Sequence, residues 1–121
     1  MGASVVDFSV GMQIDGGASP RTWHEDKAMV QARWNGATIA DSDATILLEG
    51  NHYFPPDSVN YQFLQESAES TICPWKGTAR YYTIRVNGAL NPNAAWTYPD
   101  PTPEAERIRG HLAFWKGVDI G

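Results

Sequence analysis

The residues best suited to chemistry lie close together in the sequence, beginning with a CPWKG segment. This segment holds the only cysteine of the chain, Cys73, together with Trp75 and Lys76, and Tyr82 and Trp96 follow it. Aromatic rings supply large, rigid apolar surfaces, and polar groups beside them can orient a bound molecule. The pattern therefore predicts a ligand pocket lined by these five side chains.

Two charged side chains, Lys76 and Glu49, are candidates for binding the polar part of a ligand. A lysine ammonium is a compact point charge that can hold a carboxylate or a phosphate. Glu49 is expected to end a strand at a glycine turn, where it could accept a hydrogen bond or act as a general base. If the two side chains instead pair with each other, a structural ion pair is the better interpretation of both.

Cys73 also raises the alternative of a thiol-dependent enzyme. A cysteine nucleophile needs a nearby cation or helix start to lower its pKa, and Lys76 could supply that field. However, no histidine lies within the segment, and the chain has no second cysteine to resolve an oxidised thiol. Because an unpaired cysteine is most often a small buried apolar residue, we interpret Cys73 as a lining residue without reactivity.

A second enzymatic alternative is nucleotidyl or hydrolytic chemistry based on carboxylates. Asp41 and Asp43 form a pair separated by one residue, and nucleotidyltransferases use such pairs to hold magnesium. Those enzymes also need a Gly-Ser turn that binds the nucleotide phosphates, and none precedes Asp41. The segment is more typical of a turn, in which Asp and Ser side chains bond to the local backbone.

The other aromatic residues could complete an aromatic cage or belong to a tryptophan-rich core. Tyr53, Tyr81 and Tyr98 are candidates for the cage, which would suit a planar ring or a cation. Trp34 and Trp115 lie at the ends of regularly alternating segments, so we assign them to the core.

Length and composition limit the possible functions. A chain of 121 residues is one domain, and its formal net charge of −5 argues against nucleic-acid binding. No apolar run approaches the roughly 20 residues of a membrane span. The single cysteine excludes an internal disulfide and a four-cysteine zinc site, and we infer a cytoplasmic protein without a metal or other cofactor.

From Met29 onward the chain shows the alternation of apolar and polar residues that is typical of half-buried strands. Asn35-Gly36 and Asn87-Gly88 are strong hairpin signals, because both residues of such a turn must tolerate a positive φ. Residues 1–28 lack this pattern and are interrupted by glycines. We expect a flexible arm at 1–28 and one domain at 29–121, with short strands within 30–34, 37–40, 45–49, 52–54, 61–65, 79–86, 94–98 and 111–115.

One short helix is expected after the strand that ends near Tyr98. Thr102 can cap it, Pro103 suits its first position, and Gly110 can end it. The sequence thus predicts a mainly β fold of six to eight short strands with one short helix.

The chain resembles a bacterial family called domain of unknown function 427, which has also carried a nucleotidyltransferase label. The resemblance covers about residues 29–121 and depends on these motifs: WNG at 34–36, IADS at 39–42, EGN at 49–51, YFP at 53–55, CPWKG at 73–77, YY at 81–82, AW at 95–96, YP at 98–99 and FW at 114–115. It implies a β-tent-type fold, in which two antiparallel sheets meet at one edge and diverge at the other. Some similar folds hold zinc through two Cys-x-x-Cys pairs, which this chain lacks.

The combined prediction is a small-molecule-binding β-tent domain with an aromatic-lined cleft, formed by Cys73, Trp75, Lys76, Tyr82 and Trp96. An enzyme that uses Cys73 or Glu49 remains an alternative. A further alternative is a protein-interaction scaffold with an exposed apolar patch. The ligand and the oligomeric state are left open.

Overall fold

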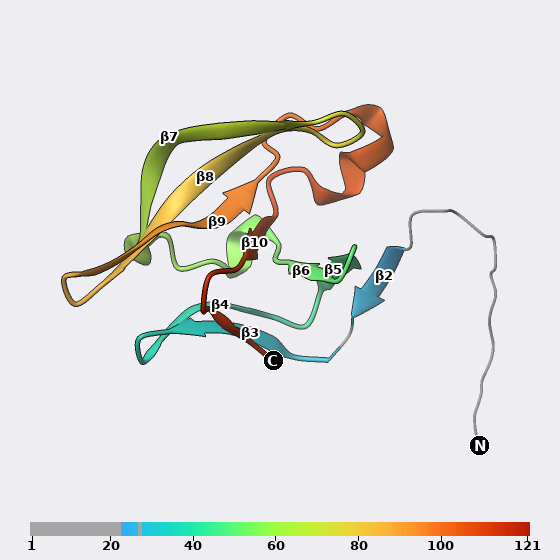
Figure 1. Cartoon of the computed structure of the whole chain (residues 1–121). Coiled ribbons are helices and arrows are strands. Elements are labelled where there is room, and N and C mark those ends of the chain that lie inside the picture. Colours follow the sequence, from blue (N-terminus) through green and yellow to red (C-terminus); the bar gives the residue numbers. More distant parts are fainter. Residues whose placement is uncertain (1–22, 27) are drawn as a thin grey trace, which may run out of the picture.

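A computed structural model describes residues 23–26 and 28–121, and it confirms the mainly β class (Figure 1). Residues 1–22 and 27, which belong to the predicted arm, lie outside the described residues. The strands are β2 (Trp23–Asp26), β3 (Val30–Trp34), β4 (Ala37–Ser42), β5 (Thr45–Leu48), β6 (Asn51–Tyr53), β7 (Leu64–Cys73), β8 (Gly77–Val86), β9 (Ala89–Thr97), β10 (Leu112–Phe114) and β11 (Asp119–Ile120).

The described strands form three antiparallel sheets, where the sequence predicted two. Their orders are β10-β9-β8-β7, β11-β3-β4 and β2-β5-β6. Figure 1 shows the four-stranded sheet on one side of the molecule and the sheet of β3 and β4 on the opposite side. Alternation indicates which face of a strand is buried but not which strand it pairs with, so the separate β2-β5-β6 sheet was missed. Strand β2 also lies before the predicted domain start at Met29.

The predicted hairpin turns are confirmed. Asn35 and Gly36 have φ values of 52° and 81°, and Asn87 and Gly88 have values of 50° and 82°. Both pairs therefore adopt the left-handed conformation that a two-residue hairpin turn requires. A third pair, Glu49-Gly50, has φ values of 55° and 80° and joins β5 to β6.

Strand β7 is much longer than predicted. The sequence suggested a strand at 61–65, but 61–63 form a 3₁₀ turn and β7 continues for ten residues to Cys73. It is an edge strand of its sheet, and most of its side chains are exposed. An exposed edge strand needs no buried face, so its sequence carries no alternation to detect.

The predicted helix is a 3₁₀ helix, η4 (Pro103–Ile108), with non-helical backbone angles at Ala105. Thr102 occupies its N-cap position, but the side chain makes no capping hydrogen bond. Its hydroxyl instead donates to the Trp75 carbonyl oxygen at 2.5 Å. The capping role predicted for Thr102 is therefore wrong, because the hydroxyl is used in a tertiary contact.

Two clusters of buried side chains form the core. The first contains Ile39, Phe54 and Ile84, and Trp34 packs against it as predicted. The second contains the buried rings of Tyr53 and Tyr98, with the partly buried Cys73, Trp75, Tyr81 and Trp96 packed against it. The second cluster therefore includes most of the residues that the sequence identified as candidates for chemistry.

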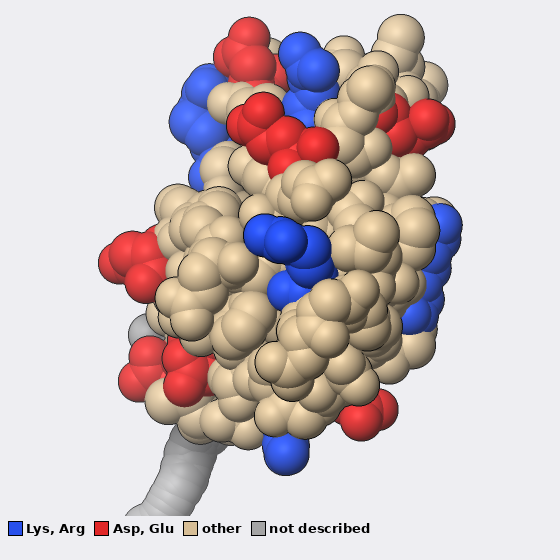
Figure 2. Space-filling model, turned by 90° about the vertical axis from the view of Figure 1, so that its left-hand side faces the viewer, with Lys and Arg blue, Asp and Glu red and all other residues tan. Residues whose placement is uncertain are grey.

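Charged side chains are dispersed on the face shown in Figure 2, where Lys and Arg alternate with Asp and Glu among uncharged residues. That face therefore presents no extended area of one sign. None of the helices in the described ranges 23–26 and 28–121 has the length and apolar character that crossing a membrane requires.

Candidate functional site

Aromatic side chains surround a pocket of about 150 Å³ beside the second core cluster. We call it the aromatic pocket. It is lined by Asn51, Tyr53, Lys76, Tyr81, Trp96, Tyr98 and Trp115.

Residues from separate strands converge on the aromatic pocket. Tyr53 is the last residue of β6, and Trp115 follows β10. Tyr81 of β8 lies directly opposite Trp96 of β9 in the antiparallel ladder. Directly opposed residues share a face of the sheet, so the phenol and the indole are neighbours. The site therefore depends on strand pairing rather than on one contiguous motif.

The rings of the pocket contact one another edge to face. Tyr53 and Trp96 have ring centroids 6.1 Å apart with an interplanar angle of 90°, and Trp96 and Trp115 have centroids 5.5 Å apart at 72°. The Trp96 indole N–H donates to the Tyr53 hydroxyl at 3.3 Å, and the Trp115 indole N–H donates to the Asn93 carbonyl at 2.6 Å. These contacts hold the walls in defined orientations.

Lys76 places a buried positive charge at the pocket. Only 8% of the residue is exposed, and its ammonium lies 5.4 Å from the Trp75 ring centroid and 5.5 Å from that of Tyr98. Burial by itself lowers the pKa of Lys76. The hydrogen bond to Glu49 and the nearby Tyr53 and Tyr98 outweigh burial, so the net effect raises the pKa of Lys76. The ammonium is therefore charged at neutral pH.

Lys76 and Glu49 form an ion pair with each other. This is the arrangement under which the sequence favoured a structural role for both residues. Glu49 does not line the aromatic pocket, and its side chain is 45% exposed. A structural role therefore fits Glu49, which compensates the buried charge of Lys76 and orients the ammonium, whereas Lys76 also lines the aromatic pocket.

The CPWKG turn is held in place by the connector that follows β9. The Lys76 N–H donates to the Cys73 carbonyl at 3.2 Å, and the Thr102 N–H donates to the Lys76 carbonyl at 3.0 Å. Together with the bond from the Thr102 hydroxyl to Trp75, these contacts fix the turn at both sides of Lys76. The position of the ammonium thus depends on a segment distant in sequence.

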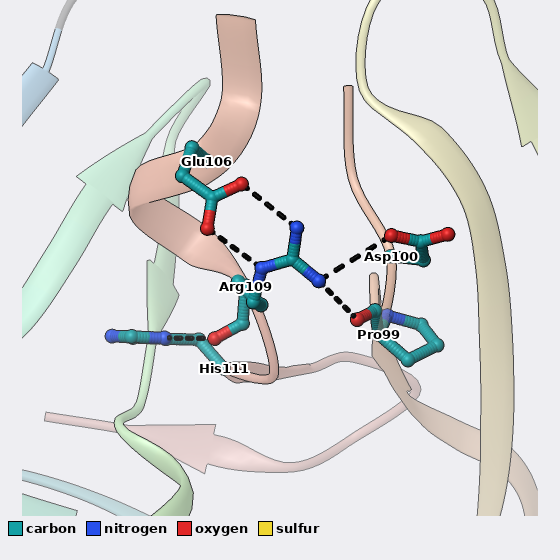
Figure 3. Close-up of polar contacts among 5 residues, drawn as sticks. All are labelled: Pro99, Asp100, Glu106, Arg109 and His111. Carbon is teal, nitrogen blue, oxygen red and sulfur yellow. Dashed lines mark hydrogen bonds and ion pairs between the residues drawn. The ribbon is translucent and has the colours of Figure 1, made fainter. Parts of the chain in front are cut away.

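The Arg109 guanidinium lies between Glu106 of η4 and the start of the same connector (Figure 3). Its guanidinium donates to both carboxylate oxygens of Glu106, at 2.6 and 2.9 Å. It also donates to the Pro99 carbonyl at 3.2 Å and to the Asp100 carboxylate at 3.4 Å. The Arg109 carbonyl is in turn 3.0 Å from the His111 Nδ1 atom. This network joins η4 to the residues that follow Tyr98.

The six predicted site residues do not all meet in one pocket. Lys76 and Trp96 line the aromatic pocket. Cys73 and Trp75 are partly buried and pack against the second core cluster, but they do not line the aromatic pocket. Tyr82 lines a different pocket, described below.

The remaining residues of the aromatic pocket were assigned from the sequence with mixed success. Tyr53, Tyr81 and Tyr98 were candidates for an aromatic cage, and all three line the pocket. Trp115 was assigned to the core, but it is 45% exposed and lines the pocket, because β10 ends at Phe114 just before it. Asn51 was missed, since a polar residue after a glycine turn gives no signal of its own.

The aspartates considered for nucleotidyl transfer lie apart from this site. Asp41 and Asp43 are both exposed. The turn predicted for this segment is wrong for Asp41 and Ser42, which belong to β4, because the strand continues to Ser42. The predicted bond of the Ser42 side chain to the local backbone is confirmed, since its hydroxyl accepts the Ala44 N–H at 2.9 Å. Within residues 23–26 and 28–121, no group of three or more His, Cys, Asp or Glu side chains is arranged to hold a metal ion.

Comparison with protein families gives a match for residues 22–120, to a family described as Domain of unknown function (DUF427). The name of the matching model still refers to nucleotide transfer, in agreement with the older label. No curated protein matches the chain. Because the family match extends over most of the sequence, from β2 to β11, the chain belongs to the DUF427 family.

Proposed function

We propose that this domain binds a small molecule with one planar ring and an acceptor or anionic group, held in the aromatic pocket. The observation that supports this most strongly is the convergence of five aromatic residues around the charged, buried Lys76. Such a combination of apolar walls and few polar groups is typical of small-molecule sites.

The volume of the pocket favours a single ring. About 150 Å³ is comparable to cavities that accommodate one benzene molecule. Edge-to-face and stacked contacts with Tyr81, Trp96 and Trp115 would stabilise a flat aromatic or unsaturated ring. A nucleotide or another multi-ring molecule would extend well beyond these walls.

Two donors near the pocket favour an acceptor on that ring. The Lys76 ammonium has three N–H groups, and Glu49 accepts from one of them. The Tyr98 hydroxyl makes no hydrogen bond to another described residue, and burial raises the pKa of Tyr98 to about 12. It is therefore a neutral donor at physiological pH. A positively charged ligand would instead meet the ammonium of Lys76.

The experiment uses a panel of simple probes with the full chain. We expect benzoate to raise the melting temperature progressively, with the logarithm of its concentration above the Kd, whereas benzylamine and acetate have little effect. Trp115→Ala removes one exposed wall without emptying the core and should weaken benzoate binding at least about tenfold, a typical cost for one well-placed aromatic wall. Tyr61→Ala, at an exposed ring outside the pocket, is the matched control.

Three results would contradict the proposal. Benzoate could leave the melting temperature unchanged, benzylamine could stabilise the protein as well as benzoate does, or Trp115→Ala could bind benzoate as tightly as Tyr61→Ala does. Each would mean that the rings and the ammonium do not act together as a binding site.

A further inference from the structure

A second pocket of about 300 Å³ lies where the pairing of β7 with β8 is interrupted. The register shifts between Glu66 and Ser70, so the β7 residues between them bulge away from Tyr81. Ser67, within the bulge, accepts the Glu69 N–H at 3.0 Å. A bulge of this kind opens space at a sheet edge and re-aims the side chains beside it. We call this space the bulge pocket.

Opposite charges line the bulge pocket without neutralising each other. Arg80 comes from β8 and Glu66 from β7, and both contribute to the lining. Within residues 23–26 and 28–121 neither is part of an ion pair, so more than 4.0 Å separates the guanidinium nitrogens from the carboxylate oxygens. The pocket therefore offers one anionic and one cationic anchor to the same guest.

Thr97 adds a buried hydroxyl that makes no hydrogen bond within the described part of the chain. The residue lines the pocket and is only 6% exposed. A buried hydroxyl without a partner is unusual, because its lost hydration is not compensated. Tyr81, Tyr82 and Pro99 complete the lining with apolar surface, and Tyr81 also lines the aromatic pocket.

We propose that the bulge pocket binds a free α-amino acid, with its carboxylate on Arg80, its ammonium on Glu66 and an apolar side chain against Tyr82 and Pro99. A guanidinium can hold a carboxylate through two parallel hydrogen bonds. A simple anion would be repelled by Glu66 and a simple cation by Arg80, so the pair selects a zwitterion. The volume equals that of about ten water molecules in the liquid, which is enough for a medium-sized amino acid.

The test is an NMR titration of the full chain with L-leucine, which carries no ring for the aromatic pocket. We expect amide shifts at Ser67, Arg80 and Thr97 up to about 10 mM ligand, a range in which a millimolar complex is largely formed. Leucinamide lacks the carboxylate and N-acetyl-leucine lacks the ammonium, and each should bind at least tenfold more weakly. Arg80→Gln and Glu66→Gln should have the same effect.

Arg85→Gln is the matched control, because Arg85 is an exposed arginine of the same strand outside the pocket. The proposal is overturned if leucine causes no shifts at the bulge, if Arg80→Gln binds like Arg85→Gln, or if N-acetyl-leucine binds as tightly as leucine. The benzoate experiment measures the melting temperature and depends on Trp115, which lines only the aromatic pocket, whereas leucine is followed by amide shifts and depends on Arg80 and Glu66, which line only the bulge pocket. This proposal and the ring-binding proposal therefore fail separately.

Discussion

At the scale of single residues, the decisive feature is the buried charge of Lys76. Removing an ammonium from water is costly unless a counter-charge and hydrogen bonds replace the lost hydration. Glu49 supplies the counter-charge, and the Trp75 and Tyr98 rings lie close enough for cation–π contact. The ion pair with Glu49 explains how Lys76 can be buried between aromatic rings and remain ionised.

Substitution of Glu49 should therefore destabilise the protein more than is usual for a half-exposed side chain. We expect Glu49→Gln to lower the free energy of unfolding by about 1–2 kcal/mol, because it leaves the buried ammonium without its counter-charge. Urea denaturation at pH 7 measures the change. The double variant Glu49→Gln/Lys76→Met should recover part of the loss, and a double variant less stable than Glu49→Gln would contradict this account.

At the scale of elements, β8 serves both core clusters. Ala79 belongs to the second cluster and Ile84 to the first, and a five-residue separation puts two residues on opposite faces of a regular strand. The register of β8 with β9 shifts between Tyr82 and Ile84, which changes the local direction of the side chains. This irregularity lies close to both pockets.

The turn at Gly77 gives a prediction at this scale. Its φ is +115°, and an added Cβ would lie 3.3 Å from both the Asp100 carbonyl oxygen and the Pro101 Cα. Gly77→Ala should cost about 2–3 kcal/mol of unfolding free energy, since it combines backbone strain with a close contact to main-chain atoms. It should also weaken benzoate binding by displacing Lys76.

Gly88→Ala is the control for that substitution, because Gly88 has a φ of +82° but nothing within 4 Å of an added Cβ. It should cost only the strain of the left-handed conformation, about 1–2 kcal/mol. If thermal or urea unfolding shows Gly77→Ala to be the milder of the two, the turn is not held against the connector as described.

At the scale of the whole molecule, three small sheets enclose two separate cores, and the second core carries ionisable groups. Tyr98 is almost entirely buried there, and burial raises its pKa to about 12 from 10.0. Burial also raises the pKa of Tyr53. The folded protein therefore keeps these phenols protonated at pH values at which the unfolded chain ionises them.

Stability should consequently fall in alkaline solution. Between pH 10 and 12 the unfolded state releases the Tyr98 proton first, so the folded state binds more protons and loses stability as the pH rises. The raised pKa of Lys76 acts in the same direction. We expect Tyr98→Phe to reduce the loss by about 1–1.5 kcal/mol, as measured by urea unfolding at pH 8 and pH 11. An identical pH dependence in Tyr98→Phe would contradict this.

Several features of the fold could be predicted because they depend on neighbours in sequence. The Asn-Gly turns and the alternation around Val30 and Ile84 depend on local backbone preferences and on which face of a strand is buried. The edge strand β7 could not be found this way, since its exposed side chains follow no burial pattern. Trp115 was misassigned for a related reason: alternation does not show where a strand leaves the core.

The sequence by itself determined the mainly β class, the family, and the group of aromatic residues from which a site could be built. Only the tertiary structure decided that Lys76 pairs with Glu49, that Tyr82 faces another pocket than Trp96, and that Trp75 packs beside the site rather than lining it. Turn and strand preferences act over a few neighbouring residues, so they can be predicted from the local sequence. Ion pairs and pocket walls join segments far apart in the chain, and their geometry exists only once the sheets have packed.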